Sequence, residues 1–148
     1  MKLLTTCIAA IAALGSASAA GLQLKNLPPA VQKTVQDTLK GGEIKNISKE
    51  TEKGVTQYEI ESMLNGKHRD FNVDSKGTLL LVEEETTMDR VPAPVKAAIM
   101  KKVDTGKLGM VETFTKTGQE MMCEAAFTTK AGKKQEALFN ADGTETKD

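Results

Sequence analysis

Two single residues are the first candidates for chemistry in this sequence. His68 is the one histidine, and Cys123 is the one cysteine outside the N-terminal segment. A cysteine nucleophile needs an activating base, and redox cysteines commonly stand in Cys-x-x-Cys pairs. Cys123 has neither a second cysteine nor a histidine close to it in sequence. We therefore expect Cys123 to be a small buried core residue, with a redox or dimer-forming thiol as the alternative, and His68 to be an exposed surface residue.

Carboxylates form the second candidate group. Glu83, Glu84 and Glu85 stand in one run, and Glu59 and Glu61 alternate upstream. Paired carboxylates can perform acid–base catalysis or hold a hard cation. A run of charge is more commonly a solvated linker or a protected edge strand. We expect the segment 83–87 to be a linker.

Two short segments resemble the start of a calcium loop. They are Asp-Ser-Lys-Gly at 74–77 and Asn-Ala-Asp-Gly at 140–143. A calcium loop of the EF-hand type needs alternating oxygen ligands and a glutamate well after the glycine, and neither segment has them. Both segments suit tight turns instead. The sequence therefore predicts no catalytic residue, no metal site and no cofactor.

The N-terminus has the pattern of a cleaved export signal over residues 1–19. Lys2 is followed by an apolar run of roughly 12 residues, which is shorter than the about 20 that span a bilayer. Ala17-Ser18-Ala19 then fits the small-x-small rule of signal peptidase. We expect a mature chain that starts near Ala20 and is periplasmic or secreted. A buried N-terminal helix and lipidation at Cys7 are the alternatives. Cys7 leaves with the signal, so Cys123 has no disulfide partner within the chain.

The composition argues against several partners. Lys and Arg number 20, as do Asp and Glu, and no tryptophan is present. A neutral chain lacks the positive field that attracts nucleic acid or anionic lipid, and aromatic stacking platforms are scarce. No stretch after the signal is long enough to cross a membrane. We expect no nucleic-acid partner and no stable membrane insertion.

An internal duplication organises the rest of the chain. The segment 27–31 (Leu-Pro-Pro-Ala-Val) returns as 91–95 (Val-Pro-Ala-Pro-Val), about sixty residues later. Each copy leads into an apolar stripe with helical spacing, because proline suits a first helical turn. The stripes are Val31, Val35 and Leu39, then Val95, Ile99 and Val103.

Alternating strand patterns and turn signals follow each predicted helix. Asn65-Gly66 is a strong hairpin signal, and Ala131-Gly132 holds the corresponding place in the second copy. The apolar strand at 78–82 has no counterpart, because the second copy ends in the polar segment 144–148, which we expect to be frayed. We expect an α+β fold of two tandem units, 20–85 and 86–148, each a helix packed on a small antiparallel sheet. Whether the units share one sheet stays open at this point.

This pattern resembles the PepSY-like family of exported bacterial proteins. The resemblance is carried by Leu-Pro-x-x-Val at 27–31, the strand entry Lys53-Gly54, the strand core 58–60 (Tyr-Glu-Ile), and Val-Asp-x-x-Gly-x-Leu-Leu at 73–80. The second copy departs from it, with Met-Met-Cys-Glu at 121–124 and no last strand. The resemblance implies a fold similar to the beta-lactamase inhibitor protein. It also implies a regulatory role at the cell envelope, and it brings no catalytic residues.

Three functional hypotheses follow. The first is a non-enzymatic envelope module that binds another protein or a peptide, inhibiting or modulating a peptidase or other envelope protein by steric occlusion. The second is a periplasmic carrier of a small ligand or cation. The third, an enzyme, lacks a catalytic constellation in this sequence. For the first, we expect the exposed hairpin tips to contact the partner, and the oligomeric state is left open. The residues concerned are Asn65, Gly66, Lys67, Ala131, Gly132 and Lys133.

Overall fold

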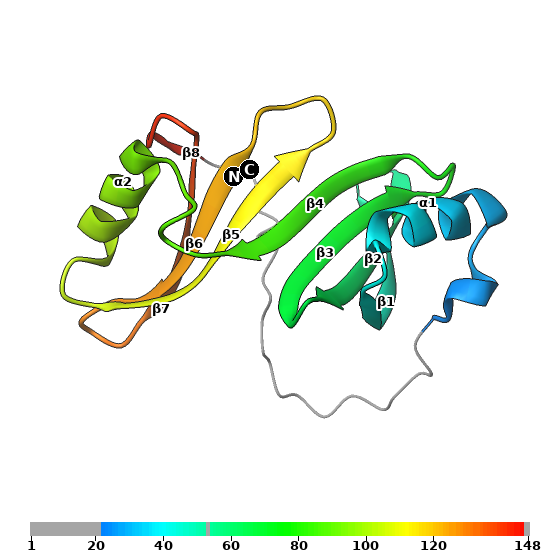
Figure 1. The fold of residues 1–148 in the computed structure, drawn as a ribbon, viewed down its shortest axis with the longest axis horizontal. Helices are drawn as coiled ribbons and strands as arrows, with labels where there is room; N and C mark the ends of the chain where they lie inside the picture. The colour runs from blue at the N-terminus through cyan, green and yellow to red at the C-terminus, as the bar shows by residue number, and fades with distance from the viewer. Residues whose placement is uncertain (1–21, 53, 147–148) are drawn as a thin grey trace.

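The computed structural model describes residues 22–52 and 54–146, which form one antiparallel sheet with two α-helices. The eight strands pair in chain order, so each strand is hydrogen-bonded to the one before it. The expected α+β class is confirmed, and the sheet is single and continuous (Figure 1). The elements are η1 (Leu24–Asn26), α1 (Pro29–Leu39), β1 (Glu43–Glu52), β2 (Val55–Leu64), β3 (Lys67–Asp74), β4 (Leu79–Thr86), α2 (Ala93–Val103), β5 (Lys107–Lys116), β6 (Met122–Thr128), β7 (Lys134–Phe139) and β8 (Glu145–Thr146).

Both helices begin directly after the repeated proline. Pro28 and Pro92 are the N-cap residues of α1 and α2. Proline at a helix start loses nothing, because its missing N–H would have no intrahelical partner. The predicted stripes face inward. The fully or almost fully buried members are Val31, Val35, Val95, Ile99 and Val103.

Both helices pack on the same face of the sheet. Along an antiparallel strand, side chains alternate between the faces, and directly paired residues share a face. Pairing places Ile60 beside Phe71, and it places Val111 beside Ala125. Residues 60 and 71 belong to the core under α1, and residues 111 and 125 to the core under α2. The pairing of β4 with β5 keeps these two cores on one side, where Figure 1 shows the helices over the two halves of the sheet.

The prediction that residues 83–87 form a linker is wrong. Residues 83–86 are the second half of β4, which pairs with β5 from Leu81–Lys116 to Thr86–Val111. The run of glutamates lacks apolar alternation, so its strand character is not evident from sequence. These residues therefore lie in the middle of the sheet and join its two halves.

The C-terminal end also differs from expectation. Glu145 and Thr146, which fall in the segment expected to be frayed, form β8 and pair with Phe139 and Leu138. This two-residue strand takes the place of the apolar strand that the second copy lacks. The predicted signal segment 1–19 lies outside the described residues. No helix in the described part of the chain is long and apolar enough to span a membrane.

Two turn glycines bring the sheet against the helix starts. Gly77 and Gly143 adopt φ angles of 90° and 84°. A Cβ on Gly77 would lie 2.8 Å from the carbonyl oxygen of Ala30 in α1, and a Cβ on Gly143 would lie 2.6 Å from that of Pro94 in α2. Only glycine satisfies both the positive φ and the close approach. The segments 74–77 and 140–143 are therefore the turns that were predicted.

Arg69 ties α1 to the centre of the sheet. Its Nη1 donates to the carbonyl oxygen of Thr38 near the end of α1, and its Nε donates to Oε1 of Glu84 at 2.6 Å. Arg69 is only 6% exposed, so its charge depends on these acceptors. Glu84 thus points to the helix side of the sheet, away from its neighbours Glu83 and Glu85.

Candidate protein-binding face

The face of the sheet opposite the helices is the candidate site, and we call it the open face. Its residues follow from the strand pairing, for example Glu59 with Asn72 and Asp70 with Glu83. Neither helix covers this face, since α1 contacts β2 and β3 and α2 contacts β6 and β7 from the other side. The open face is therefore formed by residues of the strands alone.

Carboxylates gather in the middle of the open face. Asp70 lies directly opposite Glu83 across β3 and β4. Glu85 lies opposite Glu112, and Glu112 lies opposite Glu124, which makes a row across β4, β5 and β6. With Glu59 of β2 these residues are all half-buried. We call this set the carboxylate cluster: Glu59, Asp70, Glu83, Glu85, Glu112 and Glu124.

Burial and mutual repulsion raise the pKa values within this cluster. The pKa of Glu83 is raised to about 8, first by burial and then by the charges of Glu112, Glu124, Asp70 and Glu59. Burial is also the main reason that the pKa values of Glu59, Asp70 and Glu112 are raised. Each proton that stays bound removes one negative charge from a crowded surface.

Neutral donors support the outer members of the cluster. The Oγ of Ser48 donates to Glu59 at 3.0 Å, and the backbone N–H of Ser62 donates to Asp70 at 2.8 Å. The backbone N–H of His68 donates to Glu85 at 3.2 Å. Glu83 and Glu112 have no hydrogen bond or ion pair to another residue of the described ranges 22–52 and 54–146. The centre of the cluster is therefore its least compensated part.

A small apolar cluster lies beside the carboxylates. Phe114 is only 2% exposed although it lies on the open face, opposite Glu83. It packs with Leu81 of β4 and Leu138 of β7, and the Nζ of Lys116 lies 5.6 Å from the centroid of its ring. Side chains from β4, β5 and β7 therefore pack together on this face, although β5 and β7 are not paired with each other. The open face therefore combines half-buried carboxylates with a small apolar cluster that is itself buried.

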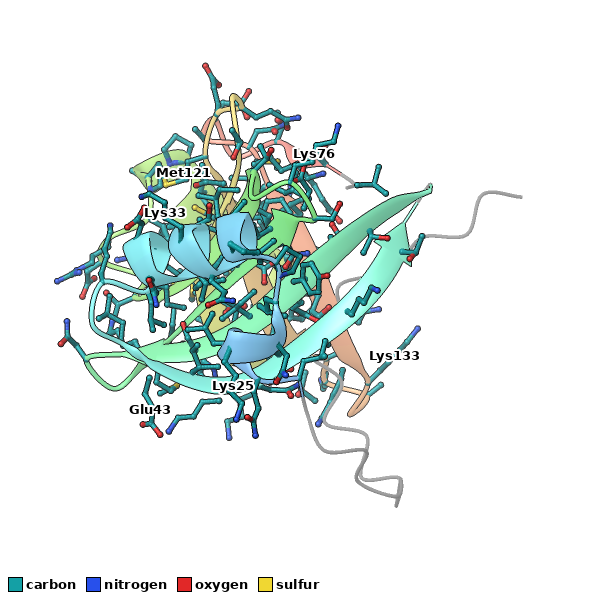
Figure 2. The ribbon with its side chains drawn as sticks, turned by 90° about the vertical axis from the view of Figure 1, so that its right-hand side faces the viewer. Lys25, Lys33, Glu43, Lys76, Met121 and Lys133 are labelled. Carbon is teal, nitrogen blue, oxygen red and sulfur yellow. The ribbon has the colours of Figure 1, made fainter. Side chains whose placement is uncertain are left out.

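The structure keeps the two predicted hairpin tips apart. Asn65 and Gly66 form the exposed β2–β3 turn with φ angles of 53° and 79°, and half-buried Lys67 begins β3. Ala131, Gly132 and Lys133 form the exposed β6–β7 turn, and Figure 2 shows Lys133 reaching out from it. Both turns follow even-numbered strands, so they lie at the same end of the meander. Four strand spacings, roughly 19 Å, separate them. They border the open face at two places and do not form one site.

The two single-residue candidates lie where they were expected. Cys123 is fully buried in the core under α2, where burial raises the pKa of its thiol. His68 is exposed at the start of β3. The described residues contain no group of three or more His, Cys, Asp or Glu side chains with a geometry suited to a metal ion.

Sequence reasoning found only part of the carboxylate cluster. It singled out Glu59, Glu83 and Glu85 but missed Asp70, Glu112 and Glu124. The usable signal was the alternation within each strand, which puts Asp70 on the face opposite to the apolar Phe71. Joining these residues into one site needed the register between strands, which a single strand does not reveal.

Several solved structures share this fold. A proposed periplasmic protein from Bacteroides eggerthii superimposes with a TM-score of 0.67 and 17% identity, covering 82% of this chain and 86% of that one. A DUF2874 family protein from Bacteroides ovatus gives 0.64 and 14%, covering 82% and 85%. A BLIP-like protein from Bacteroides fragilis gives 0.60 and 16%, covering 81% and 83%. These similarities establish a BLIP-like fold. No protein-family model and no curated protein matches the chain.

Proposed function

We propose that this chain is an exported, non-enzymatic binding module of the cell envelope that docks another envelope protein on the open face. The carboxylate cluster carries the proposal. Its three directly opposed pairs, Asp70–Glu83, Glu85–Glu112 and Glu112–Glu124, place like charges on neighbouring strands. Like charges directly opposite each other destabilise a sheet. Unfavourable surface features that persist in a well-packed fold are typical of binding sites.

The fold and the sequence pattern support this location and role. The similar structures include a proposed periplasmic protein and a BLIP-like protein. The predicted signal at 1–19 would export the chain. The element order, one helix and four strands followed by one helix and four strands, is consistent with two tandem PepSY-like units, 20–85 and 86–148.

Steric occlusion is the mechanism that fits this surface. An eight-stranded sheet presents a broad face held by backbone hydrogen bonds, and covering a partner's functional site needs no reactive group. The hairpin tips at 65–67 and 131–133 would contact the border of the same partner. A peptidase is the partner class that the resemblance suggests. The carrier hypothesis has less support, because the carboxylates are spread over several strands instead of converging on one point.

Affinity capture with matched variants tests the proposal. The mature chain, Ala20 to Asp148, is cross-linked in envelope extract and its partners are identified by mass spectrometry. The open-face variant Glu83→Gln/Glu112→Gln replaces two central carboxyl groups by amides. The control Asp37→Asn/Asp89→Asn removes two charges outside the open face, from α1 and the loop before α2, where both residues are exposed. We expect a saturable partner that the open-face variant loses and the control retains. A partner captured equally by both variants would contradict docking on this face.

A further inference from the structure

The open face is strongly acidic although the whole chain carries equal numbers of acidic and basic residues. Strand pairing assigns four basic residues to this face, namely His68, Lys107, Lys116 and Lys134. All four stand near strand ends in sequence, although the Nζ of Lys116 reaches to 5.6 Å from the centroid of the Phe114 ring. Carboxylates outnumber these basic residues on the open face. The carboxylates that the pairing places on the open face are Glu43, Glu50, Glu59, Glu61, Asp70, Asp74, Glu83, Glu85, Glu112, Glu124 and Glu136.

A second observation comes from Gln57 on the same face. Gln57 pairs with Glu50 and Asp74 and is only 9% exposed. The side-chain amide of Gln57 has no hydrogen bond to another residue of the described chain. Within the described residues, every fully buried side-chain nitrogen or oxygen has a hydrogen-bond partner. The amide must therefore reach the surface of the open face. A free amide that can both donate and accept is suited to a peptide group of a bound chain.

The spread of the carboxylates selects between kinds of cationic ligand. A divalent ion needs several oxygens converging within 2.0–2.6 Å. The cluster instead extends from β2 to β6, which is four strand spacings or roughly 19 Å. An extended chain of about six residues covers that distance. A linear polycation matches this layout better than a single ion does.

We infer that the open face binds a lysine- or arginine-rich polypeptide segment laid across β2 to β6. This inference rests on the proposed function and adds the chemistry of the partner to it. Cationic side chains would sit among Asp70, Glu83, Glu85, Glu112 and Glu124 and relieve their mutual repulsion. A peptide group of the segment would form hydrogen bonds with the side-chain amide of Gln57 at one end of the face.

Proton release provides a distinctive signature of this binding. The pKa of Glu83 is about 8 in the free protein, so its proton is largely bound at neutral pH. A positive charge placed nearby favours the ionised form and lowers that pKa. Binding of a cationic segment at neutral pH should therefore release protons to the buffer.

Isothermal titration calorimetry with a peptide of six lysines tests the inference on the whole mature chain. Titrations at pH 7.5 and low salt are run in two buffers that differ in ionisation enthalpy. We expect saturable binding with proton release. Binding should weaken by about tenfold or more in Glu83→Gln/Glu112→Gln and by less than about twofold in Asp37→Asn/Asp89→Asn. The proton release should also decrease in the open-face variant.

Three results would overturn the inference. They are no binding of the hexalysine peptide, equal weakening in both variants, and saturable binding of Ca²⁺ alone that the open-face variant abolishes. The capture experiment separates these failures from failure of the proposed function. If the open-face variant still loses its envelope partner while hexalysine does not bind, docking on this face stands and the cationic partner is rejected. If neither depends on the face, both proposals fall.

Discussion

Replacing Glu83 by glutamine should stabilise the protein in alkaline solution and have little effect in acid. Glu83 is half-buried and faces Asp70 directly across the strands. The pKa of Glu83 is about 8 in the folded protein, compared with 4.5 in the unfolded chain. Between these pH values the folded protein binds a proton that the unfolded chain releases. Stability therefore falls as pH rises through this window.

The size of the effect follows from the same two pKa values. At about 1.4 kcal/mol per tenfold change, raising the pKa of Glu83 from 4.5 to about 8 corresponds to at most about 5 kcal/mol above pH 8. Neighbouring carboxylates share the repulsion, and partial solvent exposure screens it. We expect Glu83→Gln to raise the free energy of unfolding by about 2–3 kcal/mol at pH 8.5. The difference should vanish towards pH 4.5, where both forms carry a neutral side chain.

Urea unfolding followed by far-UV circular dichroism, at pH values from 4.5 to 8.5, measures this. Glu84→Gln is the matched control, because it removes the next charge along β4 but on the helix side. That variant loses the ion pair with buried Arg69, so it should destabilise the protein by about 1–2 kcal/mol at neutral pH. A Glu83→Gln variant no more stable than the natural protein at pH 8.5, or equally stabilised at pH 4.5, would refute the reasoning.

Three further predictions concern other parts of the molecule. Gly77→Ala should lower the free energy of unfolding, measured in urea, by at least about 2 kcal/mol. The loss should exceed that of Gly118→Ala, because Gly118 has a similar φ of 78° but an added Cβ there would meet nothing within 4 Å. Equal losses in the two variants would reject the close contact of Gly77 with α1. The Cys123 thiol should react with a thiol reagent only after denaturation, because it is fully buried, and fast labelling of the native chain would contradict its place in the core. Replacing both hairpin tips, at 65–67 and 131–133, should weaken capture of the envelope partner, and unchanged affinity would exclude them from the interface.

Local patterns were enough to predict the helices and most of the turns. Val31 and Val35 are spaced for one helical face, and Asn65-Gly66 tolerates the positive φ angles that a two-residue hairpin requires. These features depend on neighbours in sequence, so they can be read without knowing the fold.

The middle of the sheet could not be predicted in the same way. Glu84 is stable within a strand because Arg69 binds it from another strand, and that partner is 15 residues away. Glu112 becomes part of a site only because pairing places it between Glu85 and Glu124. In both cases the deciding interaction is a register between strands, which the apolar pattern of one strand does not encode.

The chain-order pairing of the strands has a consequence for folding. Each strand forms its hydrogen bonds with the strand synthesised just before it, and β4 and β5 are separated only by α2 and its short connections. Contacts between near neighbours in sequence need little loop-closure entropy, which favours rapid folding. The sheet can therefore grow one strand at a time from its N-terminal side, with α1 and β1–β4 assembled before the rest of the chain becomes available.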